Sequence, residues 1–186
     1  MCILTIDNKY NQCYNKSHKW SGTQEAIRGL PASRNYRVVS QKMDSNKIGT
    51  LTELEVLHYI LRLGYSVSIP FGDKERYDQI WDINGVLVRV QVKTARINNK
   101  DKNQNSIIFN CQSSYTRRNK TINHRYKKNE VDYFATMWNN QLYLVPIEEC
   151  SDKKVLRFDA VQPQQPNISW ASNYEAERVI EKLKTL

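Results

Sequence analysis

Three features that this 186-residue sequence lacks narrow its class before any motif is considered. No apolar run approaches the roughly 18 residues that a membrane-spanning helix needs. No signal-peptide core follows the start, because Asp7, Asn8 and Lys9 interrupt it at once. The four cysteines lie far apart with no Cys-x-x-Cys pair, so neither a disulfide framework nor a zinc site is indicated. We therefore expect a protein that is not secreted and has no membrane partner, in the cytoplasm or, if encoded in an organelle, in the stroma or matrix.

Acidic residues are also scarce. The chain has 28 Lys and Arg against 19 Asp and Glu, which gives a formal net charge of +9 and a pI near 9.4. A basic balance of this size favours an anionic partner, with nucleic acid ahead of a membrane surface. The hydrophobic share of 40% is enough for a core, so we expect one domain with an extension.

The extension is predicted at residues 1–42, which hold seven Lys and Arg against two acids and show poor periodicity. Three interpretations of this basic N-terminal extension stay open. It is a basic arm that contacts DNA, a poorly ordered leader, or upstream sequence translated in frame before a start at Met43. The remaining residues, 43–186, form the predicted domain.

A tight hairpin is predicted at residues 76–94, and the domain is organised around it. Asn84-Gly85 lies between two runs rich in branched and aromatic residues, and a type I′ turn needs positive φ at both central residues. The register follows from this turn, with the cross-strand pairs Ile83–Val86, Asp82–Leu87, Ile80–Arg89 and Asp78–Gln91.

Alternation sorts the side chains of this hairpin onto two faces. One face is nearly all apolar and suits a core; its members are Tyr77, Gln79, Trp81, Ile83, Val86, Val88, Val90 and Val92. The other face ends in an acid, an amide and a lysine, with Asp78 opposite Gln91 and Lys93 one pleat further. Opposed residues have Cβ atoms about 4.5–5.5 Å apart, close enough to share one metal ion or one phosphate. The alternative is an ordinary half-solvated hairpin with a polar outer face.

A helix is predicted over residues 46–63, with Asp44 or Ser45 as its cap and Gly64 as its stop. Its apolar residues form two rows, Leu54, Leu57 and Leu61 in one and Val56, Ile60 and Leu63 in the other. Glu53 lies one turn before residues of both rows, so it borders the buried side of the helix. A carboxylate there is uncommon unless something pairs with it. A boundary glutamate whose head reaches water is the simpler alternative.

Further elements are predicted from alternation and turn signals. They are strands at 65–69 and 106–111, a second hairpin from 131–138 and 142–147, an irregular stretch at 151–172, and a last helix capped by Asn173. Together with the first helix and hairpin, these elements indicate an α/β domain.

Positive charge is concentrated in residues 93–128, which hold ten Lys and Arg against the single acid Asp101. Ser, Thr, Tyr, Asn and Gln are interspersed, and these types contact phosphates and base edges. We therefore predict a DNA-facing surface in loops beside Lys93; a solvated charged loop is the alternative. The predicted DNA-binding residues are Arg76, Arg96, Lys100, Tyr115, Arg117, Arg118, Lys120, Arg125, Lys127 and Lys128.

The polar end of the hairpin has groups that phosphodiester hydrolysis needs. That reaction needs an in-line water, a divalent cation that polarises the phosphoryl oxygen, and positive charge for the transition state. Mg²⁺ prefers oxygen ligands and keeps several waters, so one or two carboxylates suffice. We assign Asp78 as principal ligand and the Gln91 amide oxygen as second, with help from the Val92 carbonyl. Lys93 orients or activates the water and steadies the phosphate, and Glu53 adds a carboxylate if the helix packs beside the hairpin.

The helix glutamate followed by Asp78 and Gln91-Val92-Lys93 resembles the PD-(D/E)XK nuclease motif, in the variant where glutamine replaces the second acid. The similarity is closer to one branch, the homing endonucleases encoded in group I introns. The blocks that carry it, all within residues 43–149, are Gly49–Leu57, Gly64-Tyr65, Ile69–Asp73, Arg76–Asp78, Val90–Thr94, Val131–Ala135 and Tyr143–Ile147. The glutamine leaves the number of metal ions open, and Tyr77 stands where the motif has proline.

This resemblance implies a restriction-endonuclease-like core, with a mixed sheet flanked by helices. It implies a site-specific endonuclease for double-stranded DNA that depends on Mg²⁺, with Mn²⁺ able to substitute, and that acts as a homodimer or homotetramer. It also implies Glu53, Asp78, Gln91 and Lys93 as the catalytic residues. Two other functions stay open: a structure-specific nuclease for Holliday junctions or repair intermediates, and a non-catalytic DNA-binding protein that keeps the fold.

Overall fold

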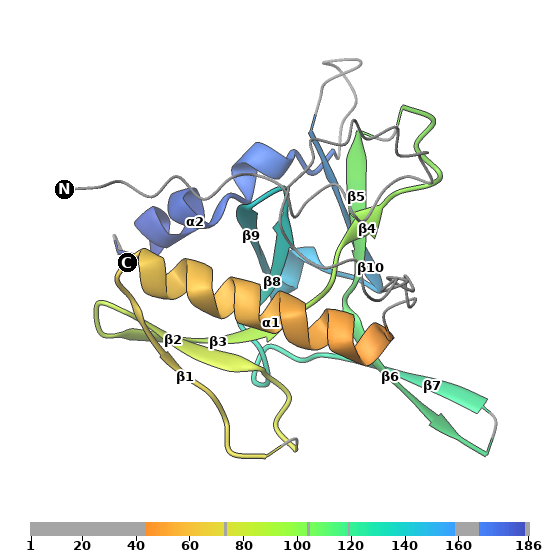
Figure 1. Cartoon of the computed structure of the whole chain (residues 1–186), viewed down its shortest axis with the longest axis horizontal. Helices are drawn as coiled ribbons and strands as arrows, with labels where there is room; N and C mark the ends of the chain where they lie inside the picture. Colours follow the sequence, from red (N-terminus) through yellow and green to blue (C-terminus); the bar gives the residue numbers. More distant parts are fainter. Residues whose placement is uncertain (1–43, 73, 104, 119, 159–167, 185–186) are drawn as a thin grey trace, which may run out of the picture. The chain divides into compact units, whose positions relative to one another are not determined.

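The computed structural model describes residues 44–72, 74–103, 105–118, 120–158 and 168–184. Its centre is a mixed five-stranded sheet of order β1-β2-β3-β8-β9, in which β3 and β8 run parallel and the other neighbours run antiparallel (Figure 1). These strands are β1 (Ser66–Ser68), β2 (Gln79–Ile83), β3 (Val86–Val92), β8 (Tyr133–Trp138) and β9 (Gln141–Pro146). The predicted mixed α/β fold is therefore confirmed, whereas the predicted N-terminal extension lies outside the described residues.

The hairpin β2–β3 forms around the predicted turn. Asn84 and Gly85 have φ of 54° and 93°, the left-handed region that a type I′ turn requires. The predicted register is confirmed from the Ile83–Val86 pair next to the turn onward. It places the buried faces of both strands on the same side of the sheet.

The last predicted pair of this hairpin does not form as a strand pair. Regular pairing ends at Gln79 and Val90, and the backbone amide of Asp78 donates to the Val90 carbonyl at 2.9 Å. The chain therefore leaves strand geometry at Asp78. This residue reaches Gln91 through its side chain instead.

Helix α1 (Ser45–Arg62) matches the predicted helix. It ends where predicted, because Gly64 adopts a φ of 88° that other residues rarely adopt. Asp44 occupies the N-cap position, but its side chain makes no capping hydrogen bond. The start of α1 is therefore held by backbone bonds such as the one from the Ile48 amide to the Asp44 carbonyl, at 3.1 Å.

One of the two apolar rows of α1 faces the core. Val56 and Ile60 are fully buried, whereas Leu54 and Leu61 of the other row are 53% and 51% exposed. Helix α1 therefore presents a row of leucines on the surface of the domain, and we refer to Leu54 and Leu61 with the neighbouring Leu51 as the leucine row.

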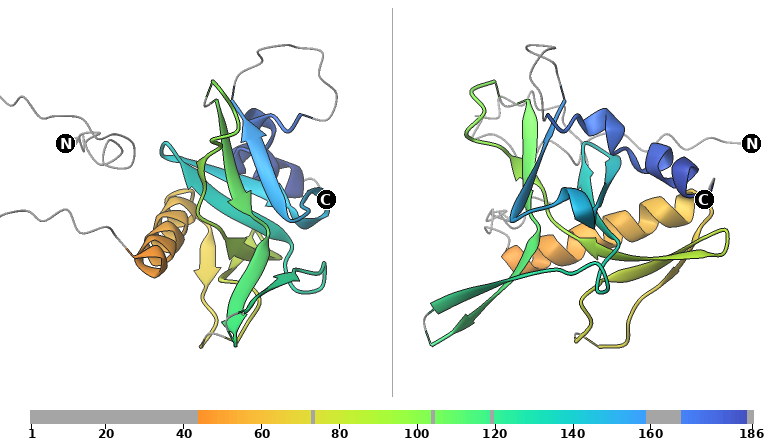
Figure 2. Two further views of the ribbon diagram at one scale, coloured as in Figure 1. Left: turned by 90° about the vertical axis from the view of Figure 1, so that its right-hand side faces the viewer. Right: turned by 180° about the vertical axis from the view of Figure 1, so that it is seen from behind.

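The central sheet is covered on both faces. Helices α1 and α2 (Ala176–Leu183) share one core cluster with inward residues such as Trp81 and Leu144. The next residue along β9, Val145, points to a second cluster on the opposite face. A second sheet of order β10-β5-β4 contributes to that cluster (Figure 2). Its strands are β4 (Arg96–Ile97), β5 (Ser106–Asn110) and β10 (Lys153–Arg157).

Two predictions for the C-terminal part are wrong. Residues 153–157, expected in an irregular stretch, form β10 and pair with β5. The last helix begins later than expected, because Asn173 ends a short 3₁₀ turn (Ala171–Asn173) and Glu175 is the N-cap of α2. Within the described residues, no helix has both the length and the apolarity to cross a membrane.

Much of the basic segment, residues 93–128, forms strands where loops were predicted. Strands β6 (Gln112–Arg117) and β7 (Lys120–Arg125) pair with each other in a separate two-stranded antiparallel sheet, which we call the ribbon. The ribbon extends away from the central sheet (Figures 1 and 2). Its strands were not predicted because most side chains on both faces are polar, so the sequence lacks the apolar alternation that marks a half-buried strand.

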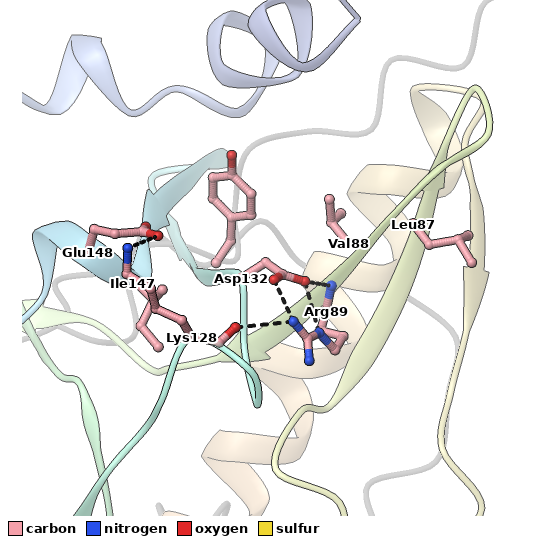
Figure 3. Close-up of a pocket in the computed structure, with 8 residues that line it drawn as sticks. Leu87, Val88, Arg89, Lys128, Asp132, Ile147 and Glu148 are labelled. Atoms are coloured by element: carbon pink, nitrogen blue, oxygen red, sulfur yellow. Dashed lines mark hydrogen bonds and ion pairs between the residues drawn. The ribbon is translucent and has the colours of Figure 1, made fainter. Parts of the chain in front are cut away.

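An ion pair fixes the junction where β8 begins beside β3. Arg89 donates to Asp132 Oδ2 through its backbone amide (2.8 Å) and Nε (3.0 Å), and to Oδ1 through Nη2 (2.7 Å). Burial alone would raise the pKa of Asp132, but the hydrogen bonds from Arg89 hold that pKa below its usual value. The pair lines a pocket of about 410 Å³ together with Lys128 and Glu148, which pair with each other at 3.0 Å (Figure 3).

We expect Asp132→Asn to lower the free energy of unfolding by about 1–2 kcal/mol at pH 7, because it weakens hydrogen bonds to a charged partner that is only partly screened by water. The pKa of Asp132 is lower in the folded protein than in the unfolded chain. Its contribution is therefore complete above the ordinary aspartate pKa and is lost as the pH falls from there through the lower pKa of the folded protein. Urea unfolding of both proteins at pH 7 and in acid measures this, with exposed Glu55→Gln as the control. An equal difference at both pH values would contradict it.

Candidate active site

Asp78 lies at the beginning of β2, where the strand pairing stops. Its Oδ2 accepts hydrogen bonds from the Val92 backbone amide (2.7 Å) and from Gln91 Nε2 (2.5 Å). Burial raises the pKa of Asp78 above its usual value, and the Val92 amide, the charge of Lys93 and the Gln91 amide oppose that rise. The carboxylate is thus fixed in position but less well solvated than a surface aspartate.

Gln91 is the next residue of the candidate site and is 8% exposed in β3. Its Nε2 points to Asp78 and lies 3.4 Å from the Val92 carbonyl. Since the nitrogen end of this amide faces the carboxylate, its oxygen is the end that remains to serve as a ligand. The predicted neighbourhood of Asp78 and Gln91 is present, although the side chains create it rather than the strand register.

Lys93 follows the end of β3 and is half-buried. Its backbone amide donates to the Ala135 carbonyl of β8 at 2.8 Å, which extends the parallel pairing by one bond. Its Nζ donates to the hydroxyl of Tyr126 at 2.9 Å and lies 4.9 Å from the centre of that ring. The ammonium group is therefore held on one side, and it is close enough to Asp78 to lower the pKa of that carboxyl.

Glu53 joins this group from α1. The residue as a whole is exposed, yet partial burial of its carboxyl raises its pKa, Asp78 raises it further and Lys93 lowers it. Gln79 Nε2 donates to the Glu53 carbonyl oxygen at 3.0 Å, so the buried face of the hairpin holds α1 at this residue. Helix α1 therefore packs beside the hairpin, as the assignment of Glu53 to the site requires.

A second contact fixes α1 to the same end of the sheet. The hydroxyls of Thr52 and Thr94 lie 3.0 Å apart, one residue before Glu53 and one residue after Lys93. The four predicted site residues are thereby brought together from a helix, a strand start and a strand end.

Tyr126 is the principal residue at this site that sequence reasoning did not single out. Besides accepting from Lys93, its ring lies beneath the Arg76 guanidinium, with Cζ 4.2 Å from the ring centre, and packs edge-on against Phe134 at 5.4 Å. Tyr126 follows β7 and is 33 positions from Lys93 in sequence, so no local spacing connects the two. The one available signal was an aromatic residue within the basic segment.

A groove of about 410 Å³ runs from the site to the base of the ribbon. The residues that line it include Lys93, Thr94, Arg96, Asn110, Gln112 and Ser113. The pocket shown in Figure 3 has a similar volume, but its charged side chains pair with each other. The groove beside Lys93 is therefore the better place for an anionic chain.

The predicted DNA-binding residues fall into two groups. Tyr115, Arg117, Arg118 and Lys120 lie in the outer part of the ribbon and are exposed. The others lie outside this outer part, and three of them form ion pairs: Arg76 with Glu130 (3.6 Å), Arg125 with Asp152 (2.7 Å) and Lys128 with Glu148 (3.0 Å). Arg96, Lys100 and Lys127 are exposed.

The atoms at the site that are assigned as ligands of a metal ion are all oxygens. No cluster of three or more His, Cys, Asp or Glu suited to a metal ion occurs in the described part of the chain. The site instead combines two carboxylates, Glu53 and Asp78, with the neutral oxygens of Gln91 and Val92. This set fits Mg²⁺, which needs few protein carboxylates because it keeps several waters.

A family model described as PD-(D/E)XK endonuclease matches residues 43–177. The chain belongs to the PD-(D/E)XK endonuclease family. Its fold is similar to that of a bacterial homing endonuclease, I-Ssp6803I, with a TM-score of 0.62 and 20% sequence identity. The similarity covers 76% of this chain and 97% of that one. A search of the curated proteins found no match.

Membership of this endonuclease family makes the chain a nuclease, and the predicted restriction-endonuclease-like fold is confirmed. The matched region includes Glu53, Asp78, Gln91 and Lys93, so the group of polar residues described above lies within the family domain. The roles of these four residues stay predictions.

Proposed function

We propose that this PD-(D/E)XK endonuclease is a site-specific, Mg²⁺-dependent nuclease of the homing type that cuts double-stranded DNA. One observation carries the proposal: Glu53, Asp78, Gln91 and Lys93 converge at the end of the sheet, beside a groove that leads to a basic ribbon. The homing branch is favoured by the resemblance of the sequence to group I intron-encoded enzymes. The structural similarity to a bacterial homing endonuclease agrees with it.

The chemistry assigns separate tasks to the side chains. Asp78 and Glu53 would hold the metal ion with the Gln91 amide oxygen and the Val92 carbonyl; when bound, the ion polarises the phosphoryl oxygen and lowers the pKa of a bound water. Lys93 binds the scissile phosphate and steadies the charge that develops on it. Its hydrogen bond to Tyr126 fixes where the ammonium group lies.

The raised pKa values of Asp78 and Glu53 agree with a site in which a bound cation stabilises the charged form of both carboxyls. Burial is the first cause for both, and the negative charge of Asp78 adds to the rise at Glu53. With two acids, we expect the site to bind metal weakly on its own. The phosphate of bound DNA would supply further oxygen ligands and negative charge.

The test is cleavage of a plasmid that carries the uninterrupted version of the locus where the gene resides, with and without Mg²⁺ and with Asp78→Ala in parallel. We expect linearisation at one position with Mg²⁺, lost in Asp78→Ala. Mn²⁺ is tested in place of Mg²⁺. Cutting of four-way junctions but not of this plasmid would indicate a structure-specific nuclease, and binding without any cutting would indicate a DNA-binding protein.

We also propose a homo-oligomer, either a dimer or a tetramer, because one site hydrolyses one strand at a time and a two-fold assembly presents two sites to the duplex. The leucine row on α1 is the apolar surface that we assign to a contact between copies. Its members Leu51, Leu54 and Leu61 are 42%, 53% and 51% exposed.

We expect Leu54→Ser with Leu61→Ser to shift the protein from oligomer to monomer at micromolar concentration, because these substitutions remove apolar area from the contact. Light scattering after size exclusion measures the mass. The control is Leu87→Ser, since Leu87 is 67% exposed on β3 rather than on α1. If the double variant keeps the mass of the original protein, the contact lies elsewhere.

A further inference from the structure

The two faces of the ribbon differ in chemistry. Residues that pair across β6 and β7 share a face, and the outer pairs Ser114–Asn123 and Thr116–Thr121 both lie on one of them. These four side chains are short, polar, uncharged and mostly exposed. We call them the uncharged face of the ribbon.

The opposite face of the ribbon contains an aromatic stack and a half-buried apolar side chain. Tyr115 stacks on His124 with ring centres 5.6 Å apart, and Ile122, which pairs with Tyr115, is half-buried. The tip of the ribbon is charged, because Arg117, Arg118 and Lys120 surround the turn, whereas Arg125 at the base is paired with Asp152. The uncharged face therefore lies between a charged tip and the body of the nuclease.

Hydrogen bonding on the uncharged face leaves donors for a partner. The hydroxyl of Ser114 donates to Asn123 Oδ1 at 2.7 Å, which fixes the orientation of the Asn123 amide. Nothing in the described part of the chain accepts a hydrogen bond from the amide nitrogen of Asn123. An amide presents two N–H donors, and the threonine hydroxyls both donate and accept.

Both sides of the ribbon are fixed to the nuclease body at its base. On the side of the uncharged face, below its four residues, Asp152 Oδ1 accepts from Gln112 Nε2 (2.6 Å) and from Arg125 Nε (2.7 Å). On the other side, Arg76 Nη1 donates to the Ser113 hydroxyl at 2.8 Å. The same Arg76 lies over Tyr126, the partner of Lys93. The orientation of the ribbon is thereby connected to that of the Lys93 side chain.

The shape and charge of the ribbon favour the major groove of B-form DNA as its binding partner. A two-stranded ribbon fits the major groove of B-form DNA, which is about 12 Å wide, and not the minor groove, which is about 6 Å wide. Positive charges at the tip suit the phosphates on the rim of that groove, and uncharged hydrogen-bonding side chains suit the base edges inside it. The major groove also distinguishes all four base pairs, which the minor groove does not.

We propose that Ser114, Thr116, Thr121 and Asn123 read base edges in the major groove next to the cleaved phosphate. This inference rests on the proposed DNA endonuclease function and names the residues that give it sequence preference. Residues along a strand advance about 3.3 Å each, and base pairs about 3.4 Å each. The two opposed side-chain pairs therefore cover about two to three adjacent base pairs.

The test is a binding selection from a randomised duplex library, read by sequencing, for the original protein, Thr121→Ala and Asn123→Ala. We expect the original protein to prefer particular bases at a short block of adjacent positions. Each variant should lose about tenfold of that preference at one or two positions within the block, while the slope of affinity against salt stays unchanged. His124→Ala, on the opposite face, is the matched control and should keep the profile.

An unchanged base profile in both variants would overturn the proposal. Weaker binding to all sequences, with a smaller salt slope, would overturn it too, because that result means phosphate contact. Circular dichroism confirms that the variants fold, which we expect because the substituted side chains are exposed. Cleavage is scored separately, so loss of cutting by every protein would reject the endonuclease function while the selection still tests the reading face.

Discussion

Lys93→Ala should cut DNA about a thousandfold more slowly and bind it almost as tightly as the original protein. Removing a preorganised positive group from a transition state costs about 10²–10³ in rate, and the Lys93 ammonium adjoins both Asp78 and the groove. Binding depends on many phosphate contacts, so the loss of one changes affinity little. Single-turnover cleavage and filter binding measure the two quantities separately.

The control for this variant is Lys153→Ala, an exposed lysine on β10 that should cut at the normal rate. A milder substitution tests the position of the Lys93 side chain. Tyr126→Phe removes only the hydroxyl that accepts from Lys93 and should slow cleavage about tenfold. Normal cutting by Lys93→Ala would mean that the candidate site is not the active site.

The second large effect is expected at the tip of the ribbon. Arg117→Ala with Arg118→Ala should weaken DNA binding at least tenfold at low salt. It should also reduce the slope of log affinity against log salt by about two, because each phosphate contact contributes about 0.9 to that slope. Both residues are exposed beside the ribbon turn and make no ion pair within the described residues. Titrations at several salt concentrations measure the slope.

The matched control is Arg62→Ala with Arg178→Ala, two exposed arginines on α1 and α2. It removes the same charge from the chain and should change the slope much less. If both double variants change the slope equally, the effect comes from net charge, and the DNA does not contact the ribbon tip.

Local chemistry made part of this fold predictable. The Asn84-Gly85 turn fixed the hairpin register because only residues that tolerate positive φ form a type I′ turn. Gly64 marked the end of α1 for the same conformational reason. Counting from the turn placed Asp78 near Gln91 and Lys93, but regular pairing stops at Gln79, and the side chain of Asp78 makes the contact with Gln91.

Strand β10 was missed because it depends on contacts between distant residues. Strand β10 contains Lys154, which is 7% exposed and reads as a surface position. It is buried because Nζ donates to Glu149 (3.1 Å to its carbonyl oxygen) and to the Tyr174 hydroxyl (3.0 Å). No periodicity analysis anticipates a lysine that is satisfied in this way. The contact of Tyr126 with Lys93 was missed for the same reason.

The attachment of the ribbon has a consequence for how such a protein changes during evolution or in engineering. Its bonds to the rest of the chain are made at its base, from Gln112 and Arg125 to Asp152 and from Arg76 to Ser113. The outer residues therefore can be exchanged without disturbing either hydrophobic core. Under the proposed function, a new target would then be acquired by changing a few surface side chains, while the candidate active site and the folding of the domain are inherited intact.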